Sequence, residues 1–127
     1  MRDYIIINSI PMKPLTYFFE PINRNAIVVR PKKPFFAWLK AIFPDDEEMQ
    51  DKPENNIYLI HEMNSNEEIR EVLSFDFDDI FTNELNDWCT DEEFWPQNRT
   101  YKMFSEWFDV EICSMVLDME DDEVLKE

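Results

Sequence analysis

The chain has 127 residues, of which 44% are apolar and 15% aromatic, and it contains no glycine. This length and apolar content suit one domain with its own hydrophobic core, which needs no disulfides or metal ions to hold it together. The lack of glycine argues against the phosphate-binding loops of common ATP, GTP and NAD enzymes, because those loops need conformations that glycine adopts at low cost. We therefore expect a protein without a nucleotide cofactor.

The net charge of −17 is unevenly distributed along the chain. Residues 1–44 hold seven of the 12 Lys and Arg residues and two of the 29 acids, a net charge of +5, whereas the rest carries −22. Such an acidic protein is not expected to bind nucleic acid or an anionic membrane, since cationic surfaces bind phosphates. We interpret the acidic face as an aid to solubility; the alternative is a surface that mimics nucleic acid or meets a basic partner.

No apolar run approaches the roughly 18 residues that cross a bilayer, and the apolar stretch near the start is too short for a secretory signal. The two cysteines, Cys89 and Cys113, do not form a Cys-x-x-Cys motif or a disulfide framework. The sequence therefore predicts a cytoplasmic protein with free thiols.

The sequence also predicts no dedicated metal site. The one histidine, His61, has only Glu62 beside it, and an EF-hand loop would need a glycine. Opportunistic binding of Ca²⁺ or Mg²⁺ at residues 45–48 or 120–123 is the alternative.

Residues 1–22 contain prolines at positions 11, 14 and 21, which favour an extended N-terminal arm or an edge strand. Residues 26–30 are apolar and β-branched, so they predict a buried strand near the centre of a sheet. A helix follows over residues 35–43, with Pro34 at its first helical position, and Pro44 ends it. Residues 57–61 then predict a second strand.

The longest helical pattern starts at the capping box of Ser65 and Glu68 and continues to Trp88, with a break or kink expected at residues 74–76. A second capping box at residues 90–93 predicts a single turn with Thr90 as its cap. Thr100 is expected to cap a helix that runs through Phe108. A strand at residues 110–117 and an acidic tail at 119–127 complete the chain.

The predicted order, β-α-β-α-α-β after the arm, describes an α+β fold: one globular domain over residues 23–118, with a small sheet of three to four strands covered by helices. So narrow a sheet needs the arm as a fourth strand, or a second subunit over one edge. The residues predicted to form the core are Val28, Trp38, Leu39, Ile80, Phe81, Leu85, Phe104, Ile112 and Val116.

Asp76 and Asp78 form an Asp-x-Asp pattern after an apolar run, which resembles the first motif of haloacid dehalogenase-type phosphatases. The resemblance implies a nucleophile, a general acid and Mg²⁺. The helical periodicity of residues 69–88 instead favours two acids on the solvent-exposed face of a helix, and we prefer that interpretation.

Aromatic residues are more numerous than a small core requires, and an exposed subset would form a binding groove or an oligomer interface. We take Trp38 and Trp95 as candidate binding residues, with five cations as polar companions: Arg24, Arg30, Lys32, Lys33 and Arg99. No catalytic residue is predicted.

Residues 23–35 with Trp38, residues 57–60, Trp95-Pro96 and residues 104–108 together resemble a family of small uncharacterised bacterial proteins over residues 23–118. The resemblance implies a compact bacterial α+β domain and no particular activity.

Our leading hypothesis is a non-catalytic cytoplasmic domain that binds a protein partner. The alternatives are a small Mg²⁺-dependent hydrolase that uses Asp76 and Asp78, and an acidic inhibitor or immunity-type protein. We also expect a homodimer, because the cationic segment 24–40 would be attracted to the acidic surface of a second copy.

Overall fold

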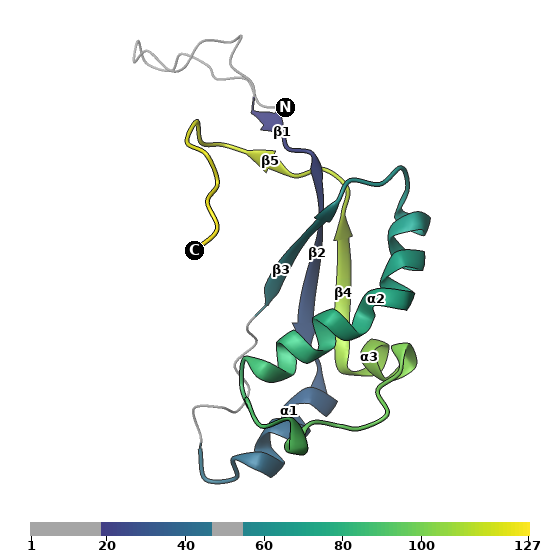
Figure 1. Cartoon of the computed structure of the whole chain (residues 1–127), viewed down its shortest axis with the longest axis vertical. Helices are drawn as coiled ribbons and strands as arrows, with labels where there is room; N and C mark the ends of the chain where they lie inside the picture. Colours follow the sequence, from purple (N-terminus) through teal and green to yellow (C-terminus); the bar gives the residue numbers. More distant parts are fainter. Residues whose placement is uncertain (1–18, 47–54) are drawn as a thin grey trace, which may run out of the picture.

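The computed structural model describes residues 19–46 and 55–127, and its main sheet has three antiparallel strands in the order β3-β2-β4 (Figure 1). The central strand is β2 (Arg24–Pro31), flanked by β3 (Asn56–His61) and β4 (Phe108–Cys113). The mixture of helices and strands confirms the α+β fold, and the central position of β2 confirms the prediction for residues 26–30.

In residues 19–46 and 55–127, three helices and one short turn accompany the sheet: α1 (Lys33–Ile42), α2 (Asn66–Asn86), α3 (Tyr101–Trp107) and the 3₁₀ turn η2 (Glu92–Phe94). Ser65 and Thr100 cap α2 and α3 as predicted, by accepting hydrogen bonds from Glu68 N and Met103 N. The cap of η2 is Asp91 and not Thr90, because the Asp91 side chain accepts from Glu93 N. None of the helices in residues 19–46 and 55–127 is long and apolar enough to cross a membrane.

The helix α2 is continuous, and it bends partway along its length (Figure 1). Within it, Ser74 Oγ donates to the carbonyl oxygen of Glu71 at 2.6 Å, a local bond of the kind that accompanies bends in helices. The sequence left open one kinked helix or two helices over this stretch, and the structure has one helix without a break.

The core lies between one face of the sheet and the helices. Ile27 and Val29 point from β2 to this side, where they pack against Phe35 of α1, Phe81 of α2 and Phe104 of α3. Five residues of the predicted core are buried: Leu39, Ile80, Phe81, Leu85 and Phe104. The other four are only half-buried: Trp38 and Ile112, which pack against the core from outside, and Val28 and Val116.

Val28 is half-buried because alternate residues of a strand face opposite sides, which places it on the face away from the helices. Its partner in β3 is Ile57, which is 66% exposed, and Leu59 on the same side is 49% exposed. Within the described residues, no helix packs on this face, so it carries exposed aliphatic side chains.

The predicted strand at residues 110–117 is wrong in its extent. The strand β4 ends at Cys113, and a separate strand β5 (Leu117–Asp118) pairs with β1 (Glu20–Pro21) in a second, two-stranded sheet. The side chain of Asn25 explains the interruption, because its Nδ2 donates to the carbonyl oxygen of Ser114 at 3.0 Å, in place of a further rung of the ladder.

The strand β1 is the described part of the predicted arm, and it belongs to this second sheet instead of adding a fourth strand to the first. Residues 1–18 of the arm lie outside the described residues. The acidic tail 119–127 has no helix or strand and is exposed.

Candidate functional site

An apolar groove lies between α1, the C-terminal end of α2 and η2. Its volume is about 750 Å³. The residues that line it are Trp38, Ala41, Ile42 and Phe43 from α1 and its end, Asn86, Asp87, Trp88, Cys89 and Thr90 from the end of α2, and Asp91 and Phe94 beside and within η2. We call this hollow the aromatic groove.

Two indole hydrogen bonds hold the walls of the aromatic groove. Trp38 Nε1 donates to the carbonyl oxygen of Phe94 at 2.8 Å, which ties α1 to η2. Trp95 Nε1 donates to the carbonyl oxygen of Cys89 at 2.7 Å, which ties η2 to the end of α2. The Phe94 side chain is nevertheless 57% exposed, so its backbone is fixed while its ring faces solvent.

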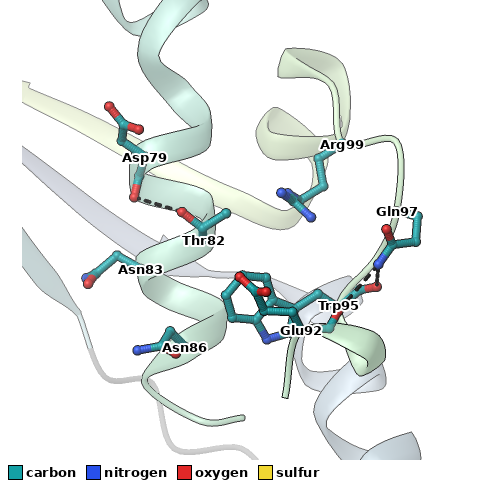
Figure 2. Close-up of a pocket in the computed structure, with 8 residues that line it drawn as sticks. All are labelled: Asp79, Thr82, Asn83, Asn86, Glu92, Trp95, Gln97 and Arg99. Atoms are coloured by element: carbon teal, nitrogen blue, oxygen red, sulfur yellow. Dashed lines mark hydrogen bonds between the residues drawn. The ribbon is translucent and has the colours of Figure 1, made fainter. Parts of the chain in front are cut away.

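On the other side of η2 lies a second hollow of about 570 Å³, which we call the polar pocket (Figure 2). Figure 2 shows α2 forming one wall and the segment after η2 forming the other. Its lining residues are Asp79, Thr82, Asn83 and Asn86 from α2, and Glu92, Trp95, Gln97 and Arg99 opposite. Asn86 lines both hollows, so the aromatic groove and the polar pocket adjoin.

Arg99 fastens the outer wall of the polar pocket to α2. Its Nε lies 2.7 Å from Oδ1 of Asp78 and its Nη2 lies 3.2 Å from Oδ2, while Nη1 donates to the carbonyl oxygen of Pro96 at 2.9 Å. The hydrogen bonds to Asp78 raise the pKa of Arg99 further above its ordinary value. The guanidinium also lies 5.9 Å from the centre of the Trp95 ring, within the range of a cation–π contact.

The preceding residue, Asn98, has a φ of 56°, and asparagine tolerates this left-handed conformation better than most residues. In a chain without glycine, Asn98 lets the segment turn back so that Arg99 reaches Asp78.

A buried polar network lies next to the polar pocket. Glu84 of α2 is 3% exposed, and its Oε2 accepts hydrogen bonds from Tyr58 Oη at 2.5 Å and from Asn56 Nδ2 at 2.6 Å. Asn83 Nδ2, from the lining of the pocket, donates to Tyr58 Oη at 2.9 Å. No buried side-chain nitrogen or oxygen in the described part of the chain lacks a partner, so these hydrogen bonds stabilise the packing of β3 against α2.

Burial raises the pKa of Glu84 above its ordinary value, and the hydrogen bonds from Tyr58 and Asn56 only partly offset that rise. Burial and the adjacent Glu84 carboxylate raise the pKa of Tyr58, so the phenol remains a hydrogen-bond donor. Sequence analysis missed this network. One signal was present: Glu84 follows Ile80 by four positions and Phe81 by three, a spacing that places it on the buried face of α2.

Three of the seven predicted binding residues come together around η2. Trp38 lines the aromatic groove, and Trp95 and Arg99 line the polar pocket. The other four do not line either hollow: Arg24, Arg30, Lys32 and Lys33. Arg24 bonds to Asn23, Arg30 forms an ion pair of 2.9 Å with Glu111 of β4, and Lys32 and Lys33 lie at the start of α1.

The two aspartates of the Asp-x-Asp pattern do not converge. Both lie within α2, where two steps along the chain rotate by about 200° around the axis, so the two side chains face nearly opposite sides. Asp78 is held by Arg99, and Asp76 is exposed. Across residues 19–46 and 55–127, no group of three or more His, Cys, Asp or Glu side chains is placed to hold a metal ion.

Comparison of the chain with protein-family models, with curated proteins and with solved structures yields no match. The resemblance to a bacterial family therefore stays a prediction.

Proposed function

We propose that this chain is a non-catalytic binding domain whose aromatic groove holds an apolar segment of a partner protein. The observation that carries the proposal is the exposed side chain of Phe94 at the rim of the groove, on a backbone that the hydrogen bond from Trp38 holds in place. Exposed apolar surface with a polar rim is characteristic of protein-binding sites, and buried aromatic contacts supply much of the binding energy at such sites.

The rim favours one class of partner. Asp87 and Asp91 line the groove, and no lysine or arginine among the described residues does. An acidic segment would meet two carboxylates there without a compensating cation, so the occupant is a segment with a bulky aliphatic or aromatic anchor and no acidic residue beside it.

The geometry of α2 supports binding over hydrolysis. A phosphatase of the type that Asp76 and Asp78 resemble needs both carboxylates at one reacting centre. In this helix the two side chains diverge, and Asp78 serves as the anchor of Arg99.

Selection of random 12-residue peptides displayed on phage against the full chain tests the proposal. The affinity of each selected peptide is then measured for the wild type, for Phe94→Ser and for Phe75→Ser. Phe75 is the matched control, because it is 78% exposed and lines none of the hollows described above.

We expect Phe94→Ser to weaken binding about tenfold or more, since it removes a large apolar contact, and Phe75→Ser to leave the affinity unchanged. The proposal fails when no peptide is selected, or when the two serine variants bind every peptide as the wild type does.

From the sequence, we also propose that the protein is cytoplasmic and that it associates with itself. Cys89 and Cys113 are free thiols in the structure, which is consistent with a reducing compartment. The exposed face of Ile57 and Leu59 offers apolar surface for a second copy.

A further inference from the structure

The turn η2 is a thin wall between the two hollows. Glu92 at its start lines the polar pocket, and Phe94 at its end lines the aromatic groove. Asn86 of α2 lines both. A chain segment that occupies the groove therefore passes within reach of the polar pocket.

The segment that contributes residues to both hollows carries only negative charge. Residues 79–98 include six acids and no lysine or arginine. Asp79 and Glu92 line the polar pocket, and Asp87 and Asp91 line the groove.

Arg99, the one cation that the described part of the chain contributes to the lining of the pocket, already has bonding partners. Its Nε and Nη2 bond to Asp78, and its Nη1 bonds to the carbonyl oxygen of Pro96. Arg99 therefore offsets the charge of Asp78 and is poorly placed to attract an anion into the pocket. The remaining charges in the lining are the carboxylates of Asp79 and Glu92.

The other groups in the pocket also suit a cation with several N–H donors. Figure 2 shows Asp79, Asn83 and Asn86 along the wall formed by α2, with the Asp79 carboxylate at the far end of that wall, and Glu92 and Gln97 on the facing side. The amide oxygens can accept hydrogen bonds from a cation beside Glu92, and the Asp79 carboxylate adds to the negative potential there. A guanidinium or ammonium group presents three to five such donors, which an anion or an apolar side chain does not.

We propose that the partner segment bound in the aromatic groove carries an arginine or lysine side chain that enters the polar pocket. This inference rests on the proposed function, and it adds the class of partner: a cationic segment with one apolar anchor. Because an extended chain advances about 3.3 Å per residue and the hollows adjoin, the basic residue lies within about four positions of the anchor.

The test uses the peptides selected above and a second set with each basic residue replaced by glutamine. Affinities are measured for the wild type, for the double variant Asp79→Asn/Glu92→Gln, and for Glu93→Gln. Glu93 is the matched control, because it is an exposed acid of η2 that lines neither hollow.

We expect the selected peptides to be enriched in arginine or lysine near an apolar anchor. Replacement of that basic residue should weaken binding to the wild type and to Glu93→Gln by about tenfold, as loss of a charge-assisted hydrogen bond does. For the double variant, the same replacement should weaken binding by less than about twofold.

The two proposals fail in different ways. Two results would overturn the proposal of a cationic partner but not that of a binding domain. Either the peptides need Phe94 and are not enriched in basic residues, or the basic residue contributes equally to binding in the double variant. Binding that does not depend on Phe94, or the selection of no peptide at all, overturns both.

Discussion

The hydroxyl of Tyr58 donates a hydrogen bond of 2.5 Å to Oε2 of Glu84, and this bond joins the edge strand β3 to the C-terminal end of α2. Glu84 is buried beside Asn56, so its carboxylate has lost most of its contact with water. The cost of burying that charge appears as the raised pKa of Glu84.

The raised pKa of Glu84 makes stability depend on pH. In the unfolded chain the group titrates near its ordinary value of 4.5, and in the folded protein it titrates higher. Its favourable contribution is therefore fully present below 4.5 and is lost as the pH rises through the folded-state pKa. Glu84→Gln keeps an oxygen that accepts from Tyr58 and Asn56 but cannot ionise, so we expect it to equal or exceed the wild type in stability at neutral pH.

Urea unfolding from pH 4 to pH 8 measures this effect, with Glu71→Gln as an exposed control on the same helix. The difference in unfolding free energy between Glu84→Gln and the wild type should grow in favour of the variant as the pH rises, and the control should show no such trend. A difference that stays constant with pH would show that Glu84 has the same pKa in the folded and unfolded states.

Substitutions along α2 test the assignment of its buried face. Phe81 and Leu85 are fully buried, whereas Phe75 is exposed. We expect Phe81→Ala to cost about 3 to 5 kcal/mol, Leu85→Ala about 2 to 5, and Phe75→Ala less than about 0.5. Thermal and urea unfolding provide the values. If Phe81→Ala and Leu85→Ala both melt within about a degree of the wild type, the buried face of α2 has been misassigned.

The contact of Arg99 with Asp78 should depend on the shape of the guanidinium as well as on its charge. Arg99→Lys keeps the charge but cannot make both bonds to Asp78 and the bond to the carbonyl oxygen of Pro96. Because Asp78 is partly exposed, we expect a modest loss of stability of about 1 kcal/mol.

Amide hydrogen exchange locates that loss. Exchange at Met103 and Phe104, whose amides donate to Thr100 directly after Arg99, should become faster in Arg99→Lys. It should stay at the wild-type rate in Arg24→Lys, whose guanidinium bonds to its neighbour Asn23. Equal exchange in the two variants would mean that the ion pair does not hold the outer wall of the polar pocket.

Self-association should rest mainly on the exposed face of the main sheet. Exposed ion pairs contribute about 0 to 1 kcal/mol each and are screened over roughly 8 Å at physiological salt. Arg30, moreover, pairs with Glu111 of its own chain. We expect a dimer that loosens as salt rises without dissociating fully, and that Leu59→Ser weakens further because Leu59 is 49% exposed on that face.

Sedimentation equilibrium at low and high ionic strength measures both effects. A monomer under all conditions rules out the dimer. If dimerisation does not depend on salt, ion pairs do not contribute to it, and apolar contacts hold the two copies together.

Features that depend on neighbouring residues could be predicted from the sequence. The helix caps Ser65 and Thr100, the strand within residues 24–31 and the buried positions Phe81 and Leu85 all follow from patterns a few residues long. Backbone hydrogen bonding and side-chain periodicity act over that same short range, so the pattern and the structure agree there.

Features that depend on distant segments were decided by the tertiary structure. Periodicity places Val28 and Val29 on opposite faces of a strand but does not tell which face the helices will cover, and here they cover the face of Val29. In the same way, nothing near Trp38 or Arg99 in the chain indicates that they lie on either side of η2. The aromatic groove forms only where α1 packs against the end of α2 and η2, and the polar pocket only where the segment from Glu92 to Arg99 folds back onto α2, so both depend on contacts between separate segments.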